Sequence, residues 1–356
     1  MLTLATLLSV WLAAQVAGPR TAAQWSTDGW QALRAGNAEA AARAFDEALR
    51  LDARDPLSML GAGVAAHLRG RTEDARQDLA GALRLQPALT AASLLLGEIL
   101  YRETDLQGAI AVYEQALAYA PANAQLTTKL EAWRREAAVH DSFSQRIASH
   151  FTIMFEGPPD QPLAARVAEM LESAYWRIGG AIGAYPRDVV PVVLYSKEQF
   201  RDVTQSPGWA GGMFDGRIRV PVGGKIDDSD LERVLAHELT HAIVRGLSPR
   251  GVPQWLNEGL AVLFEPTGAV RGPLRAPDTP LIPLTRLERS FTGLSTADAR
   301  LAYAESAQAT QRVIDVGGPM AIYNLLTNIG AGVPFDVAFE RAVLMPYAEF
   351  LKNWTE

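Results

Sequence analysis

Small and large apolar residues recur every 34 positions in the N-terminal third of the chain. The small positions are Gly29, Gly63 and Gly97, then Ala41, Ala75 and Ala109, then Ala48, Ala82 and Ala116; the large positions are Phe45, Leu79 and Tyr113, then Leu49, Leu83 and Leu117. A repeat of this length is typical of stacked helical hairpins, each of which buries its apolar face only against its neighbours. The small residues let two helices approach closely, and the large ones fill the groove between repeats.

The repeat resembles the tetratricopeptide repeat in its period, in its Ala-x3-aromatic-x2-Ala core and in the prolines Pro87 and Pro121. We expect three such repeats over residues 22–123, followed by a capping helix and linker over 124–145. The resemblance implies that the concave face of the repeats binds a protein or peptide partner. A purely structural spacer is the alternative, because three repeats make a short array.

From His150 the pattern changes, and short apolar runs alternate with helical segments. We expect strands at His150–Glu156 and Val189–Tyr195, a hairpin at 213–222, and helices at 161–184, 299–316, 318–329 and 335–353. Asp215 and Gly216 are a two-residue turn signal in the hairpin. In its second arm Arg217 and Arg219 alternate with apolar residues, so we expect both in solvent. Pro221 indicates an edge strand.

A well-marked helix follows the hairpin and contains the motif H-E-x-x-H. A capping-box pattern at Ser229 predicts its start, and Gly246 predicts its end. Residues four apart lie on one face of a helix, so His237 and His241 can hold one metal ion. Glu238 lies about 100° further round the helix, from where its carboxylate can reach a water on that metal.

Two histidines do not complete a hydrolytic zinc site, which takes a third protein ligand and leaves one position open. A second helix, PQWLNEGLAVLFE, begins near Pro253, and residues 246–252 allow it to return antiparallel to the first. At about 1.5 Å per residue, Glu258 then falls at nearly the same level as His241. We therefore expect Glu258 to be the third ligand, with Glu265, two turns later, as the alternative.

The sequences HELTH and WLNEGLA together resemble the zinc site of the gluzincin metallopeptidases. The closer resemblance is to peptidase-like domains of that clan that are attached to tetratricopeptide repeats, and it covers about residues 146–356. It implies one Zn²⁺ per chain, with His237, His241 and Glu258 as ligands and Glu238 as the general base. The implied reaction is hydrolysis of a peptide bond.

Two further roles, the donor to the oxyanion and the residue that orients a ligand histidine, are not identified by these motifs. In this clan a Tyr or His commonly donates to the developing oxyanion, and Tyr303 is our candidate for a catalytic role; ordinary helix packing is the alternative. Thermolysin-type members carry an acidic residue four positions after the ligand glutamate, where this chain has Val262. The residue that orients a ligand histidine is therefore not assigned by the sequence.

The composition narrows the possible chemistry. The chain has 356 residues, of which 48% are hydrophobic and 21% charged, as expected for a folded protein of about two domains. Its net charge of −7 argues against nucleic acid as a partner. The absence of cysteine excludes disulfides, thiolate metal ligands and cysteine nucleophiles. A metal site must therefore draw on carboxylates and the five histidines.

The N-terminus begins with an apolar run from Leu2 to Ala14, followed by small residues. A spanning helix needs about 20 residues, so the run is too short to cross a bilayer. We interpret residues 1–20 as a signal peptide, which predicts export to the periplasm or secretion. No second run of this length follows, so we expect no stable transmembrane span. A buried first helix is the alternative.

The sequence thus predicts an α+β protein overall: an N-terminal all-α solenoid of helical hairpins, then a gluzincin-like α+β metallopeptidase domain. Our preferred hypothesis is an exported zinc metallopeptidase whose repeats bind a protein partner or substrate. The alternative is a noncatalytic repeat scaffold with a relic metallopeptidase lobe. Glu238 favours the enzyme, because a relic has no chemical need for that carboxylate. A zinc hydrolase acting on a non-peptide amide is a third hypothesis.

Overall fold

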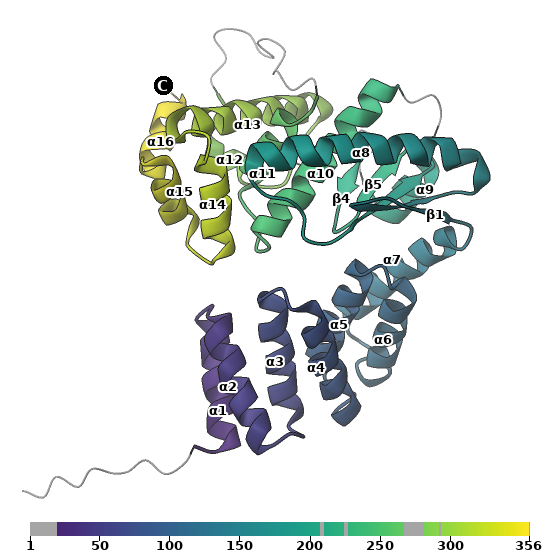
Figure 1. Ribbon diagram of the computed structural model, residues 1–356, viewed down its shortest axis with the longest axis vertical. Coiled ribbons are helices and arrows are strands. Elements are labelled where there is room, and N and C mark those ends of the chain that lie inside the picture. Colours follow the sequence, from purple (N-terminus) through teal and green to yellow (C-terminus); the bar gives the residue numbers. More distant parts are fainter. Residues whose placement is uncertain (1–19, 207–209, 224–226, 267–280, 292, 356) are drawn as a thin grey trace, which may run out of the picture. The chain divides into compact units, whose positions relative to one another are not determined.

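The computed structural model describes residues 20–206, 210–223, 227–266, 281–291 and 293–355 (Figure 1). The chain divides into two compact units, Met1–Thr128 and Lys129–Glu356. The expected signal peptide lies outside the described residues, apart from Arg20. No helix in the described ranges combines the length and the apolar character that crossing a membrane requires.

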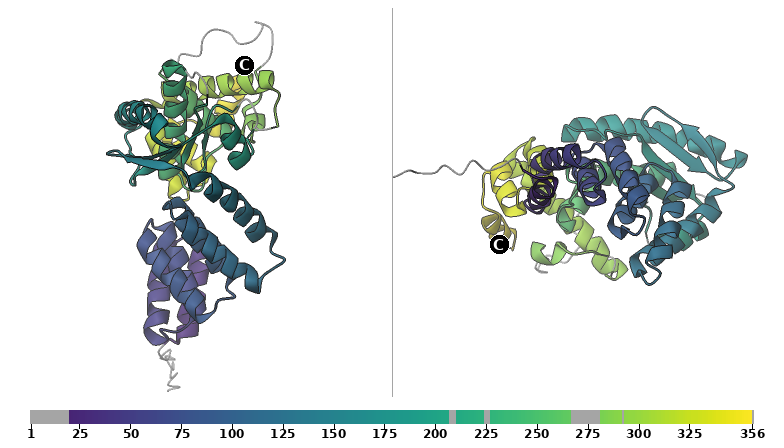
Figure 2. Two further views of the ribbon diagram at one scale, coloured as in Figure 1. Left: turned by 90° about the vertical axis from the view of Figure 1, so that its right-hand side faces the viewer. Right: turned by 90° about the horizontal axis from the view of Figure 1, so that it is seen from below.

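The described part of the first unit is built from helices that pack in chain order (Figure 2). They are α1 (Ala22–Arg34), α2 (Ala38–Leu51), α3 (Pro56–Leu68), α4 (Thr72–Leu85), α5 (Thr90–Arg102), α6 (Leu106–Tyr119) and the start of α7 (Ala124–His140). Helices α1 and α2, α3 and α4, and α5 and α6 form hairpins, and α2–α3 and α4–α5 contacts join them. The predicted all-α solenoid of helical hairpins is confirmed.

Close approach at the repeating glycines explains the period of the sequence. A Cβ atom at Gly29 would lie 2.7 Å from the Phe45 ring, and one at Gly97 would lie 2.2 Å from the Tyr113 ring. Phe45 and Tyr113 are fully buried. The first helix of a hairpin therefore lacks a side chain where the second helix inserts its largest one, which fixes the distance between them.

The second unit contains a five-stranded mixed sheet with the order β1-β2-β3-β5-β4. Its strands are β1 (Ser144–Ile147), β2 (Phe151–Phe155), β3 (Val190–Tyr195), β4 (Met213–Phe214) and β5 (Ile218–Pro221). The pairs β2–β3 and β3–β5 are parallel, whereas β1 and β4 are antiparallel edge strands. The predicted hairpin is present as β4 and β5.

The prediction that Pro221 marks an edge strand was wrong. Strand β5 lies inside the sheet, between β3 and β4. Pro221 is tolerated because it is the last residue of β5 and lies beyond the two-residue strand β4, which pairs only with Ile218 and Arg219. The missing N–H of the proline therefore costs no bond to β4.

Helices cover both faces of this sheet. One face, which includes Ile153, Val192 and Val220, packs on α8 (Gln161–Ile182) and α10 (Asp228–Leu247) to form the main core of the unit. On the other face, Val193 and Tyr195 pack with Phe200 of α9 (Lys197–Thr204) and with Val139 near the end of α7. The end of α7 is thus part of the second unit and covers the sheet.

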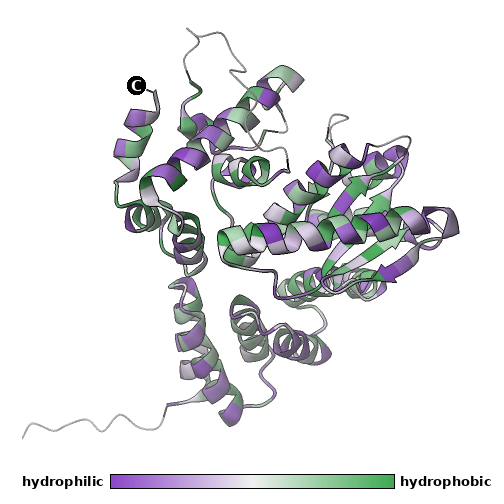
Figure 3. Cartoon of the chain, turned by 45° about the horizontal axis from the view of Figure 1, so that its top comes forward, coloured by the Kyte–Doolittle hydropathy of each residue, from purple (hydrophilic) through white to green (hydrophobic). Residues whose placement is uncertain are grey.

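A helical lobe completes the second unit. It contains α11 (Gln254–Leu263), α12 (Leu284–Leu287), α13 (Thr296–Gly317), α14 (Ala321–Gly330), α15 (Phe335–Val343) and α16 (Tyr347–Thr355). Hydrophilic and hydrophobic bands alternate along most helices in Figure 3, as expected where each helix buries one face. The last predicted helix, 335–353, is two helices, because the left-handed residue Leu344 (φ 58°) and Pro346 interrupt it.

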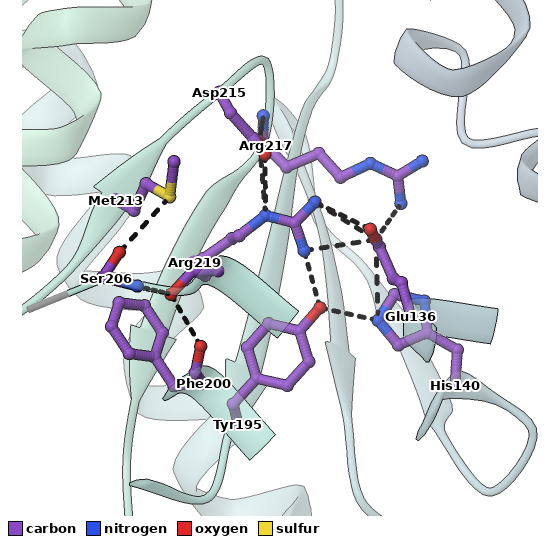
Figure 4. Close-up of polar contacts among 10 residues, drawn as sticks. Glu136, His140, Tyr195, Phe200, Ser206, Met213, Asp215, Arg217 and Arg219 are labelled. Carbon is purple, nitrogen blue, oxygen red and sulfur yellow. Dashed lines mark hydrogen bonds and ion pairs between the residues drawn. The ribbon is translucent and has the colours of Figure 1, made fainter. Parts of the chain in front are cut away.

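A buried polar cluster joins α7 to the hairpin (Figure 4). The Arg219 guanidinium donates to both carboxylate oxygens of Glu136 at 3.1–3.2 Å, to the Tyr195 hydroxyl at 2.6 Å and to Asp215 at 3.1 Å. Arg217 lies 3.6 Å from Glu136. Both arginines are only 1% exposed, so the prediction that they lie in solvent was wrong. The alternation of residues along β5 predicts that both side chains point away from the main core. It does not predict that α7 covers the face on which they lie.

His140 completes this cluster as a neutral group. Its Nε2 atom lies 2.8 Å from the Tyr195 hydroxyl. Burial lowers the pKa of His140 to about 4; the positive charges of Arg217 and Arg219 act in the same direction, and the negative charge of Glu136 opposes them. When His140 is neutral, the two positive charges of the arginines balance the two negative charges of Glu136 and Asp215.

The depressed pKa of His140 predicts that acid destabilises the second unit. As the pH falls, His140 becomes protonated near pH 6.5 in the unfolded chain but only near pH 4 in the folded chain. The free energy of unfolding therefore decreases as the pH falls between these two values. From pH 7 to pH 5, the protonation of His140 in the unfolded chain should lower the free energy of unfolding by about 2 kcal/mol. Urea unfolding of wild type and His140→Gln at both pH values measures it, and equal pH dependence in the two proteins would contradict the assignment.

Candidate metal centre

Helix α10 carries the H-E-x-x-H motif and packs its apolar face on the sheet. Asp227 caps the helix by accepting a hydrogen bond from the Ser229 amide, so the helix starts before the predicted capping box. It also continues through Gly246 to Leu247, because Leu247 packs against both cores of the second unit. The motif therefore lies in the middle of a long, anchored helix.

The two motif histidines and Glu258 converge on one point. The imidazole rings of His237 and His241 lie 4.9 Å apart, and both side chains are largely buried. Helix α11 packs against α10 and places Glu258 Oε2 3.3 Å from His237 Nε2 and 3.5 Å from His241 Nε2. One ligand atom from each of the three residues lies within 4.8 Å of the others.

The donor atoms at this point fit a metal ion. Glu258 Oε1 accepts a hydrogen bond of 2.7 Å from Gln254, which fixes the carboxylate. Glu258 Oε2 is buried and has no hydrogen-bond donor among the described residues. A buried carboxylate oxygen without a donor is costly unless a cation satisfies it. Two imidazoles and one carboxylate are a ligand set that suits zinc and leaves a coordination position open.

The electrostatics of the three groups also favour a cation. Burial alone would raise the pKa of Glu258, but His241 and His237 beside it hold that pKa well below its usual range. Burial alone would lower the pKa of His237, but the carboxylates of Glu258 and Glu265 raise it to about 10. The site therefore requires positive charge near Glu258, which protons or a metal ion can supply.

Glu238 lies beside this trio and not among its converging atoms. It is 5% exposed, and burial raises the pKa of its carboxyl group. The backbone just before β4 lies directly against it: a Cβ atom at Gly212 would be 2.7 Å from Glu238 Oε1 and 2.8 Å from Val234 Cγ1. No pattern in the sequence indicates this contact, because Gly212 and Glu238 are distant in the chain.

Glu265 contacts His237 and does not join the converging atoms. Its Oε1 atom lies 2.9 Å from His237 Nδ1, the ring nitrogen that faces away from Glu258. Arg233 lies 3.7 Å from the same oxygen, and Arg177 donates to the Phe264 carbonyl at 2.9 Å. Glu265 thus takes the place that the sequence left unassigned at Val262. The histidine–carboxylate contact fixes the imidazole tautomer.

Tyr303 is brought to the site by α13. Its ring centroid lies 6.1 Å from that of His237, and burial raises the pKa of its hydroxyl group. The packing of α13 on α11 depends on Gly259, where a Cβ atom would lie 2.1 Å from Thr310 Oγ1 and 2.3 Å from the Ser306 carbonyl oxygen. Gly259, next to Glu258 in the chain, therefore sets the distance from Tyr303 to the converging side chains.

Comparisons with known proteins divide the chain in the same way as its structure. A family model described as "Peptidase MA superfamily" matches residues 172–355. A tetratricopeptide repeat model matches residues 28–90 and 70–124. None of the curated proteins matches the chain.

Among solved structures, the chain is similar to "First TPR of Spaghetti (RPAP3) bound to HSP90 peptide SRMEEVD", with 20% identity, a TM-score of 0.32, and coverage of 33% of this chain and 96% of that chain. It is also similar to the first TPR domain of the human RPAP3 protein, with 21% identity, a TM-score of 0.32, and coverage of 34% and 96%.

The superfamily match spans slightly more than half of the chain and contains every residue of the site. His237, His241 and Glu258 lie within it, as do Glu238 and Tyr303. The expected gluzincin-type domain and the tetratricopeptide repeats are both confirmed. The chain belongs to the peptidase MA superfamily and carries tetratricopeptide repeats in its N-terminal part.

Proposed function

We propose that this chain is a zinc-dependent metallopeptidase. The observation that carries the proposal is the convergence of His237 Nε2, His241 Nε2 and the unsatisfied Glu258 Oε2, beside the buried carboxylate of Glu238. Zinc held by the first three residues would lower the pKa of a water and polarise the scissile carbonyl. A noncatalytic scaffold would have no chemical need for Glu238, a second buried carboxylate beside Glu258.

Glu238 acts as the general base in this proposal. Its carboxylate takes a proton from the attacking water and passes it to the amine that leaves. A general base works best when its pKa lies near the operating pH, and burial moves the pKa of Glu238 upward from its usual value. The Gly212 backbone packs on the carboxylate and limits the directions in which it can turn.

Tyr303 donates a hydrogen bond to the developing oxyanion. Burial and the carboxylates of Glu258 and Glu238 raise the pKa of its hydroxyl group, so it stays protonated at neutral pH and can donate. Its ring lies against His237, on the side of the site that α13 closes. Tyr303→Phe would remove the donor and leave the packing in place.

Strand β4 offers a place for an extended peptide. It is an edge strand of the sheet, and its start lies against Glu238. An extended chain can add to such an edge by main-chain hydrogen bonds, which recognise a peptide backbone whatever its sequence. This geometry supports a peptide as the substrate over a non-peptide amide.

We also propose that the repeats bind a protein partner or the substrate, and that the chain is exported. Helical-hairpin repeats form extended surfaces suited to peptide recognition. The apolar N-terminal run supports export to the periplasm or secretion. These two proposals are independent of the chemistry at the metal centre.

The substitution Glu238→Gln tests the peptidase proposal. We expect it to reduce peptide release from a broad protein mixture by about 10²–10⁴-fold, because the amide cannot take the proton of the water. Released peptides are identified by mass spectrometry, and bound zinc is measured in the same samples. Identical peptides from wild type and variant would contradict the proposal and favour the scaffold.

Glu265→Gln tests the assignment of Glu265 as the residue that orients His237. We expect a loss of about 10–100-fold in zinc affinity, because the histidine loses its charged partner. Competition with a zinc chelator measures the affinity, and Glu169→Gln, which removes an exposed carboxylate of α8, is the control. An affinity equal to that of the control would contradict the assignment, and complete loss of binding would instead make Glu265 a ligand.

A further inference from the structure

A cluster formed by the buried residues Glu136 and Arg219 and the partly exposed Asp215 connects α7 to the hairpin beside Glu238. Arg219 lies between two carboxylates: Glu136 of α7 on one side and Asp215, in the hairpin turn, on the other. Figure 4 shows the Arg219 guanidinium between the two carboxylates, with the Tyr195 hydroxyl on a further side of it. Every nitrogen of the Arg219 guanidinium has a partner: Nε bonds Asp215, Nη1 bonds Glu136 and Tyr195, and Nη2 bonds Glu136.

The same hairpin carries the backbone that touches the catalytic carboxylate. Gly212, which lies against Glu238, directly precedes β4, and Asp215 directly follows it. Because β4 has only two residues, its pairing with Ile218 and Arg219 contributes little to its position. Phe214 packs on the main core and Met213 on the opposite face of the sheet, and the Arg219–Asp215 ion pair adds a directional link at the end of the strand.

We propose that Glu136, Arg219 and Asp215 are positioning residues for peptide hydrolysis, which hold β4 where its backbone meets Glu238 and an added peptide strand. The inference rests on the proposed function. Arginine suits this task because its planar guanidinium forms bidentate bonds to a carboxylate in a fixed direction. Apolar side chains of similar volume would stabilise the fold equally well, so stability alone does not explain the ion pairs of this cluster.

Glu136 lies outside the parts of the chain that the family models match. The superfamily model begins at residue 172 and the repeat model ends at residue 124, whereas Glu136 is near the end of α7. The inference therefore extends the catalytic unit to include α7. The boundary expected at residue 146 would separate the hairpin from its partner carboxylate.

Hydrogen exchange on the full-length protein tests the positional part of the inference. Glu136→Gln breaks the cluster from α7, and Asp215→Asn breaks it from the turn, where the side chain is 32% exposed. Glu131→Gln, an exposed position on the same helix, is the matched control. We expect both cluster variants to speed exchange in the segment 210–222 by about ten-fold or more, while segments of α10 exchange as in the control.

Peptide hydrolysis by the same variants tests the functional part. We expect kcat/KM to fall by about ten-fold or more, mainly through a higher KM, because the strand that receives the peptide is misplaced while Glu238 and the metal ligands are not. Zinc content should equal that of the control. A merely structural role would not move KM selectively at constant zinc content.

The outcomes separate this inference from the proposed function. If wild type is no more active than Glu238→Gln, the proposed function fails, and the exchange of 210–222 still decides whether the cluster holds the hairpin. If wild type is active and the cluster variants match Glu131→Gln in exchange and in kcat/KM, the inference is overturned. Equal acceleration of exchange in every segment, including α10, would also overturn it, because the cluster would then serve global stability alone.

Discussion

The structure of the site depends on one constraint: a buried carboxylate oxygen faces two imidazole nitrogens and has no hydrogen-bond donor in the described part of the chain. Glu258 Oε2 lies 3.3 Å from His237 Nε2 and 3.5 Å from His241 Nε2, which is close enough for one cation to satisfy all three. Such a group is costly to bury without positive charge. The surrounding elements act by keeping these three atoms close together and largely buried.

The packing around the trio explains how its geometry is maintained. Helix α10 is fixed by the sheet on one side, and α11 and α13 close the other. Gly259 permits the close contact of α11 with α13 and so brings Tyr303 to His237. Glu265 holds the second nitrogen of the His237 ring. On the other side, Gly212 brings the edge of the sheet to Glu238.

Local spacing explains what the sequence could predict. The 34-residue period gave the helical hairpins, and the i, i+4 spacing placed His237 and His241 on one face of α10. The length of the connection to the second helix placed Glu258 at their level. In each case a few residues of one or two adjacent helices determine the arrangement, so a periodic pattern carries the information.

The sequence did not reveal contacts between elements that are distant in the chain. Alternation put Arg217 and Arg219 on the face of β5 away from the main core, but only the fold shows that α7 covers that face and pairs them with Glu136. Glu265, two turns after Glu258, was the alternative third ligand, but the end of α11 turns it toward His237 Nδ1. Non-local partners of this kind have no periodic signature.

The most direct test of the central claim is the metal content of the full chain, purified without chelator or metal-affinity tag and measured by plasma mass spectrometry. The account predicts about one zinc ion per chain in wild type and much less in Glu258→Gln, which keeps the shape of the side chain but loses its charge. An absence of metal from wild type, even after dialysis against zinc, would contradict it.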